Sequence, residues 1–188
     1  MYREEPFVVG IALDISLRHD KNDRRIIDVV KEQLVEYVRT FDYVDLFYLY
    51  HENVVDVVEG LGKRIHSVAS YQSDGFEFDL NYAMKQTLYV VGSEDDDKRI
   101  HLITDRFSDK SLKTIRKVAM LNEKDGLDCK IYVTAIGNRN NQEALEALKE
   151  EGFLNCVLSD PSELHQSLMN EDSNGTDDQQ FPTTTESV

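Results

Sequence analysis

The sequence predicts a three-layer, doubly wound α/β domain built on a mostly parallel sheet of about six strands. Apolar runs such as 7–13 and 100–104 are unbroken, which is typical of strands buried on both faces of a parallel sheet. Segments with the spacing of core-facing helices alternate with these runs. The chain has 188 residues, of which 40% are hydrophobic, enough for one sizeable core.

The first half of the chain predicts three strands and a long helix. Residues 7–13 form the first strand, and Asp23 caps a helix that runs to about Thr40, because apolar residues recur there every third or fourth position. Residues 43–50 form the second strand and 54–58 a short third one. Because the connection between them is short enough for a hairpin, we expect the third strand to be antiparallel and at the sheet edge.

The middle and the second half of the chain continue this alternation. A short helix over 63–69 and a loop over 71–75 are expected first. Helices and strands then follow in turn: 79–91, 99–104, 111–121, 130–136, 141–151 and 154–158. Gly152 is expected to end the helix that precedes the last strand. The segment Ser159-Asp160-Pro161 opens a final helix with a proline in its first turn.

The chain changes character near residue 170. From there it is rich in Asp, Ser, Asn, Gln and Thr, with five acidic residues and no basic ones. Such a segment cannot bury enough apolar surface to fold, so we expect residues 170–188 to be a disordered acidic tail. The sequence therefore predicts one domain over 1–169, followed by this tail.

Charge and composition narrow the function classes. The net charge of −15 argues against a nucleic-acid binder, since phosphate contacts need clustered Lys and Arg. No run approaches the roughly 18 apolar residues of a membrane span, and the N-terminus lacks a signal-peptide pattern. The only two cysteines look like small buried hydrophobes, as in a reducing cytosol. We expect a cytoplasmic protein without membrane or nucleic-acid partners.

Two aspartates mark the functional edge of the predicted sheet. Asp14 and Asp105 each follow a buried strand, and ligands of doubly wound sheets gather outside the carboxyl ends of the strands. The pair suggests a cation site, a partner-binding site, or the remains of one. No glycine-rich turn or GxxxxGK[ST] loop is present, so nucleotide binding is not expected. No histidine is placed by its spacing to act as a base for Ser16, and the histidines and cysteines do not have the spacing of zinc ligands. We therefore expect no catalytic residues.

Together these features resemble the von Willebrand factor A (vWA) domain. The resemblance covers residues 7–169: a hydrophobic strand followed by Asp-x-Ser, the expected order of elements, and a strand that ends in Thr-Asp. Asp79-Leu80 with Ala83-Met84 resembles the opening of the family's third helix, and 131–137 resembles its fifth strand. Members with an intact site bind a divalent cation, usually Mg²⁺, through Asp-x-Ser-x-Ser, a threonine and an aspartate.

The resemblance implies a degenerate metal site. Asp14, Ser16 and Asp105 fit the family's ligand pattern, whereas Arg18 stands where the second serine belongs and Phe78 where the threonine belongs. A small hard cation takes oxygen ligands in octahedral array, which a guanidinium and a phenyl ring cannot supply. The expected cofactor is therefore none, or a weakly held Mg²⁺.

Arg18 is also a candidate replacement for the metal. A guanidinium within about 4–6 Å of two carboxylates competes for the same electrostatic niche as a cation, and it forks two hydrogen bonds to a carboxylate. We expect Arg18 to pair with Asp14 or Asp105. The alternative is that Arg18 points into solvent beside His19 and Asp20.

The loops at this edge carry the residue types found at binding hot spots. The expected partner-binding residues are aromatic and charged: Arg18, His19, Phe76, Glu77, Phe78, Arg106 and Phe107. One or both of Phe76 and Phe78 could instead fill the space of the lost metal.

The sequence thus favours a non-enzymatic module that binds a protein partner. Intracellular relatives of the vWA type serve as scaffolds or adaptors in multiprotein assemblies, including ones with AAA ATPases, and this partner class is implied by resemblance alone. The first alternative is a working Mg²⁺-dependent domain that captures an acidic side chain. The second is a receiver-like phosphoryl acceptor at Asp14, for which no convincing set of partner residues is present.

Overall fold

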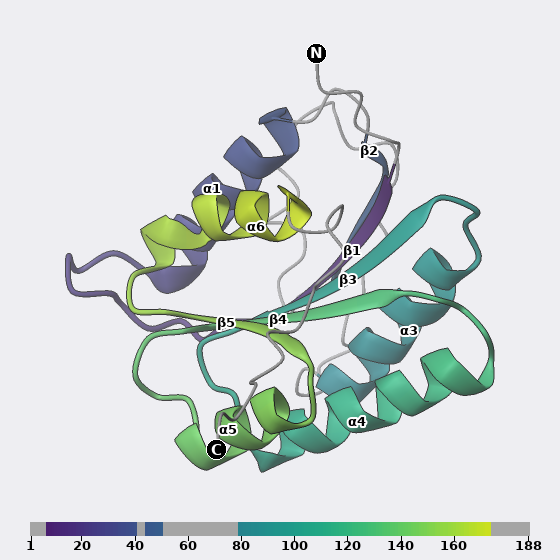
Figure 1. Ribbon diagram of the computed structural model, residues 1–188. Coiled ribbons are helices and arrows are strands. Elements are labelled where there is room, and N and C mark those ends of the chain that lie inside the picture. Colours follow the sequence, from purple (N-terminus) through teal and green to yellow (C-terminus); the bar gives the residue numbers. More distant parts are fainter. Residues whose placement is uncertain (1–6, 41–43, 51–78, 174–188) are drawn as a thin grey trace, which may run out of the picture.

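The computed structural model describes residues 7–40, 44–50 and 79–173. Within these ranges a five-stranded sheet, with all its neighbouring strands parallel, lies between two layers of helices (Figure 1). The α/β class and the parallel sheet are confirmed. The strand expected over 54–58, and with it the sixth strand and the antiparallel edge, lies outside the described residues, as do the helix over 63–69 and the loop over 71–75.

The strand order reverses at the first strand. The strands are β1 (Phe7–Asp14), β2 (Val44–Tyr50), β3 (Asp97–Thr104), β4 (Lys130–Ile136) and β5 (Leu154–Leu158). Their order in the sheet is β2-β1-β3-β4-β5. The second strand is therefore added on one side of β1, and β3, β4 and β5 are added in turn on the other side. The carboxyl ends of β1 and β3 meet at this switch point, where doubly wound sheets form their binding crevice.

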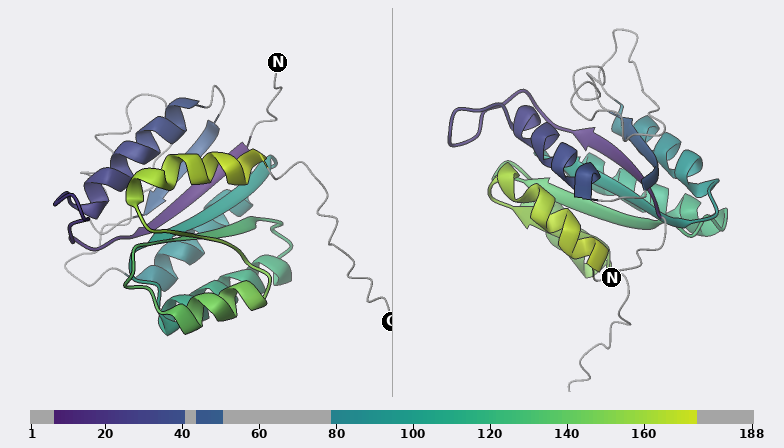
Figure 2. Two further views of the ribbon diagram at one scale, coloured as in Figure 1. Left: turned by 60° about the vertical axis from the view of Figure 1, so that its left-hand side comes forward. Right: turned by 90° about the horizontal axis from the view of Figure 1, so that it is seen from above.

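Helices cover both faces of the sheet. They are α1 (Ile26–Thr40), α3 (Leu80–Gly92), α4 (Asp109–Lys124), α5 (Gln142–Glu150), the short 3₁₀ helix η2 (Pro161–Glu163) and α6 (Leu164–Ser173). Helices α1 and α6 lie on one face, and α3, α4 and α5 lie on the other (Figures 1 and 2).

Alternation along β1 supplies both cores. Val9, Ile11 and Leu13 pack toward α1 and α6, while Val8 and Ala12 pack toward α3, α4 and α5. All five side chains are fully buried, which is why the run is apolar without interruption.

Gly10 lets α3 approach the sheet closely. A Cβ atom at Gly10 would lie 2.4 Å from Cγ2 of Thr87 and 2.7 Å from Cγ2 of Val91, both on α3. Any larger side chain would push α3 away from β1, so the glycine fixes the distance between this helix and the sheet.

Most expected elements lie close to their expected bounds, but the helix expected over 111–121 runs from Asp109 to Lys124, because Ser108 caps it. Asp79 caps α3 by accepting from the Tyr82 backbone N–H at 3.2 Å, Asn141 caps α5, and Pro161 lies in the first turn of η2. Gly152 follows α5 with a φ of 81°, as a C-terminal glycine does. Helix α6 runs to Ser173, a few residues past the expected domain end at 169.

The expected cap at Asp23 is wrong. Asp23 has a φ of 59° and lies in a loop, and α1 begins at Ile26. The carboxylate of Asp20 organises this loop instead, accepting from the backbone N–H groups of Asn22 (2.8 Å) and Arg24 (3.0 Å). The residue that caps the start of a helix usually has an extended backbone conformation, whereas the backbone of Asp23 is in the left-handed region.

Candidate functional site

Asp14 and Asp105 lie together at the switch point. Asp14 ends β1 and is in register with Thr104, which ends β3, so Asp105 is the first residue beyond the sheet. The Asp105 N–H donates to the Asp14 carbonyl at 3.4 Å. Asp14 is 8% exposed and Asp105 3%, so both carboxylates need partners within the protein.

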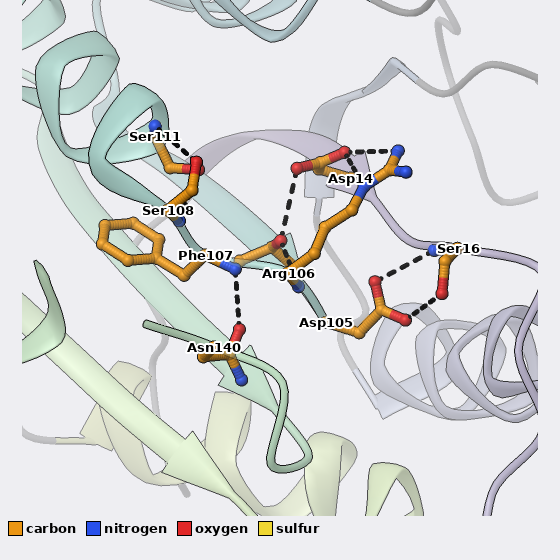
Figure 3. Close-up of polar contacts among 9 residues, drawn as sticks. Asp14, Ser16, Asp105, Arg106, Phe107, Ser108, Ser111 and Asn140 are labelled. Carbon is orange, nitrogen blue, oxygen red and sulfur yellow. Dashed lines mark hydrogen bonds and ion pairs between the residues drawn. The ribbon is translucent and has the colours of Figure 1, made fainter. Parts of the chain in front are cut away.

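The partner of Asp14 is Arg106. Both Nε and a terminal nitrogen of the guanidinium lie 2.8 Å from Oδ1 of Asp14, across a sequence separation of 92 residues (Figure 3). The Thr104 hydroxyl donates to Oδ2 of Asp14 at 3.3 Å and accepts from the Arg106 backbone N–H at 3.1 Å. Thr104 therefore holds both members of the ion pair.

The partner of Asp105 is Ser16. The Ser16 N–H donates to Oδ1 of Asp105 at 3.0 Å, and the Ser16 hydroxyl donates to Oδ2 (Figure 3). Both carboxylate oxygens are thus engaged by the loop that follows β1. This contact ties the β1–α1 loop to the end of β3.

The expected pairing of Arg18 with Asp14 or Asp105 is not formed, and Arg106 pairs with Asp14 instead. Among the described residues, Arg18 forms no ion pair with Asp14 or Asp105. Its backbone carbonyl accepts from the Ile26 N–H at 2.8 Å, and the neighbouring His19 forms an antiparallel bridge with Arg25. The loop turns back at this point, which leaves the partly exposed Arg18 side chain on the wall of a neighbouring hollow.

Phe107 is not available to a partner in this structure, so its placement on the binding surface is wrong. The ring is 1% exposed and belongs to the core beneath α4 and α5. Its backbone N–H donates to Oδ1 of Asn140 at 2.7 Å, and its carbonyl accepts from the Asn141 N–H. His19 is exposed, as expected. Phe76, Glu77 and Phe78 lie outside the described residues.

Sequence reasoning missed the loop after β4. The Asn140 side chain donates to the carbonyls of Ile136 and Gly137, both at 3.1 Å, while it accepts from Phe107. It thereby fixes the β4–α5 loop against the β3–α4 loop. The signal was present, because residues 137–140 follow a buried parallel strand and must emerge at the same edge as Asp14 and Asp105.

A hollow of about 420 Å³ opens at this edge beside Asp105. Charged and polar residues of three loops line it: Arg18 and His19, Asp105, Asn138 and Arg139. We call it the Arg18–Arg139 hollow. A second hollow of about 650 Å³ shares His19 and Asn138 with it and extends toward the end of β5.

An exposed ion pair joins the first and last loops of this edge. Lys21 Nζ lies 2.8 Å from Oδ2 of Asp160. The hydrogen bond from Lys21, followed by those from Ser162, lowers the pKa of Asp160 to about 2. Both residues line the second hollow, and the low pKa of Asp160 keeps the pair charged at mildly acidic pH.

The carboxylates as arranged do not fit a divalent cation. Asp14 would have to give up its ion pair with Arg106, and Asp105 its hydrogen bonds from Ser16, before either could act as a ligand. Nowhere in the described part of the chain do three His, Cys, Asp or Glu side chains gather as a metal site requires.

Comparisons with known proteins leave the family open. No known protein-family model matches this chain, and no curated protein matches it either. Among the described residues, no helix is both long and apolar enough to cross a membrane. The structure shows the class of fold, which is an α/β, Rossmann-like domain with a parallel sheet and charged residues at its switch point.

Proposed function

We propose that this protein is a non-enzymatic protein–protein interaction module of the vWA type, in which Arg106 takes the place of the metal ion. The observation that carries the proposal is the ion pair between Arg106 and Asp14 at the switch point. A fixed guanidinium neutralises Asp14 as a cation would, and it needs no exchangeable ligand from solvent.

The construction of the edge supports a binding role. Three loops are fixed to one another through Asp105–Ser16, Arg106–Asp14 and Phe107–Asn140. A rigid platform that presents loop side chains loses little conformational entropy when a partner binds. The partner is proposed to be a protein, and its membership of a larger assembly, such as one with an AAA ATPase, rests on the resemblance alone.

A second candidate is a Mg²⁺-dependent interaction domain. It is favoured by the placement of Asp14, Ser16 and Asp105 at one point of the sheet edge, as a metal site of this type needs. In that case the cation would have to displace the Arg106 guanidinium from Asp14. The two candidates therefore differ in which cation holds Asp14.

A Mn²⁺ titration distinguishes them. We expect the wild-type protein to show no saturable Mn²⁺ broadening of the NMR signals around Asp14 and Asp105. We expect Arg106→Ala to bind Mn²⁺ about tenfold or more tightly than the wild-type protein does, because the substitution frees the Asp14 carboxylate. Arg116→Ala, which frees the carboxylate of Glu151 on the surface, is the matched control and gains nothing at the switch point. Tight wild-type binding that Asp14→Ala abolishes would establish the Mg²⁺-dependent alternative.

Capture of partners tests the binding face. The full chain is used to pull down and cross-link proteins from extracts of its source, together with Arg18→Ala and Asp105→Ala. We expect cross-links at the switch-point loops and loss of the partner in both variants. The same partners retained in all three samples would place the binding face elsewhere.

A further inference from the structure

The arginines whose side chains the structure describes fall into two groups. Where the structure describes the side chain, most arginines pair with a carboxylate: Arg24 with Glu32, Arg25 with Asp28, Arg99 with Asp97, Arg106 with Asp14 and Arg116 with Glu151. Arg18 and Arg139 have no carboxylate partner among the described residues. Both line the same hollow of about 420 Å³.

This pairing deficit is unexpected on so acidic a chain. The chain has 36 acidic and 21 basic residues, so carboxylates outnumber the cationic side chains that could pair with them. Among the described residues that line the hollow, two guanidiniums stand against the one carboxylate of Asp105, which leaves this lining with a small excess of positive charge. Asp105 is 3% exposed, and both its oxygens accept hydrogen bonds from Ser16, so it has no ion pair with either arginine.

The backbone holds both arginines in place. The Arg18 carbonyl accepts from Ile26 at 2.8 Å, two residues beyond Ser16, which is fixed to Asp105. Arg139 lies between Gly137, whose N–H donates to Leu158 at 2.8 Å, and Asn140, whose side chain is buried. The positions from which the guanidiniums extend are therefore set before any ligand arrives, which lowers the entropic cost of binding.

We propose that the Arg18–Arg139 hollow binds a phosphorylated side chain of the protein partner. This inference rests on the proposed function and names the chemistry that the partner presents. A phosphoryl group carries a charge of about −1.5 to −2 and three acceptor oxygens. Two guanidiniums, each able to fork two hydrogen bonds, match that charge and acceptor number better than a single carboxylate does.

The size of the hollow and the charge of the chain support this ligand. A volume of about 420 Å³ lies within the roughly 300–1,000 Å³ of ligand pockets. An anionic membrane or a nucleic acid presents many charges over a wide area, and the net charge of −15 opposes both. A single phosphoryl group on a protein segment needs only the local field of the hollow, since charges beyond about 8 Å are screened in physiological salt.

Binding to degenerate peptide pools tests the proposal. Three fluorescein-labelled pools with a central phosphoserine, phosphothreonine or phosphotyrosine are titrated with the full chain, beside pools that carry the unmodified residue or glutamate at that position. We expect at least one phosphorylated pool to bind about tenfold more tightly than its unmodified counterpart, the range of a charge-assisted interaction.

Matched variants locate the binding. Arg18→Gln and Arg139→Gln are each expected to weaken binding of the phosphorylated pool about tenfold, and Lys117→Gln, which removes an exposed charge from α4, is expected to leave it unchanged. Equal binding of phosphorylated and unmodified pools, or equal losses in all three variants, would overturn the proposal. Equal binding of the glutamate pool would overturn the choice of phosphate.

Inorganic phosphate separates the two possible sources of the phosphoryl group. It should compete with the phosphorylated pool only weakly. If it binds in the hollow while no peptide pool does, the site serves a small molecule and the protein-partner inference fails. Cross-links at the switch-point loops in the capture experiment, combined with no phosphopeptide preference, would leave the interaction module standing and overturn only its phosphate chemistry.

Discussion

The two ends of β3 use the same kinds of side chain in opposite ways. At its start, Arg99 pairs with Asp97 two residues earlier in the strand, at 2.8 Å, and Lys130 reaches Asp97 from β4 at 3.3 Å. At its end, Arg106 does not pair with its neighbour Asp105. It reaches Asp14 on β1 instead, and Asp105 takes Ser16 as its partner.

The two ends of β3 therefore differ in what their charged side chains contact. At the starting end, Arg99 pairs with Asp97 on its own strand and lies 4.3 Å from the ring centroid of Phe7 on β1. At the carboxyl end, the contacts join three loops to one another, and Arg18 and Arg139 line a hollow beside them. The charged side chains at the start of β3 contact residues of neighbouring strands, whereas those at its end connect loops.

The largest expected effect lies between the two ends, at His101. Its ring is 1% exposed and stacks on Tyr132 with centroids 4.8 Å apart. Burial, assisted by Arg99, lowers the pKa of His101 from 6.5 to about 3. Because the unfolded chain takes up this proton below pH 6.5 and the folded one does not, stability is full above pH 6.5 and falls as the pH drops toward 3, by up to about 1.4 kcal/mol per pH unit.

Urea unfolding at a series of pH values measures this effect. His101→Phe keeps a ring against Tyr132 and removes the proton site, so we expect a clearly shallower decline between pH 6.5 and 4. His19→Gln, which changes an exposed loop histidine, should retain the wild-type slope. An unchanged slope in His101→Phe would mean that other groups cause the acid sensitivity.

The next effect compares the two ends directly. Asp105→Ala removes the acceptor for two Ser16 donors at a buried position, so we expect a loss of about 2–3 kcal/mol. Asp97→Ala breaks ion pairs of a carboxylate whose side chain is 32% exposed, so about 1 kcal/mol or less is expected. Urea midpoints at an unchanged m-value measure both. An equal or larger loss for Asp97→Ala would remove the distinction between the ends.

The smallest effect is expected at the hollow. Arg18→Gln and Arg139→Gln break no ion pair among the described residues, so each should change stability by no more than about 0.5 kcal/mol. Thermal unfolding of both variants beside Lys117→Gln checks this. A loss above about 1 kcal/mol in either would show that the arginine stabilises the loops rather than serving a ligand.

Much of the fold follows from local pattern. The unbroken apolar runs predicted β1 and β3, and β4 and β5 lie where their apolar residues predict. The helices expected from 79 and 141 are present, with Asp79 and Asn141 as their capping residues. The prediction of a cap at Asp23 was wrong because aspartate is a common capping residue. The loop is instead organised by Asp20, whose hydrogen bonds to the backbone of Asn22 and Arg24 depend on the conformation of the whole loop. The expected strand over 54–58 stays a prediction.

The sequence by itself determined the class of fold and the edge at which the site lies. Unbroken apolar runs predict buried strands, and helices that alternate with these strands predict that the strands are parallel. The sequence did not determine which guanidinium meets Asp14. Arg18 and Arg106 are both close in sequence to one of the two aspartates, and only the return of the β1–α1 loop at Ile26 and the path of the chain beyond Thr104 decide between them. Side-chain pairing across about ninety residues depends on where the backbone places each Cα atom, and that placement is a property of the packed tertiary structure.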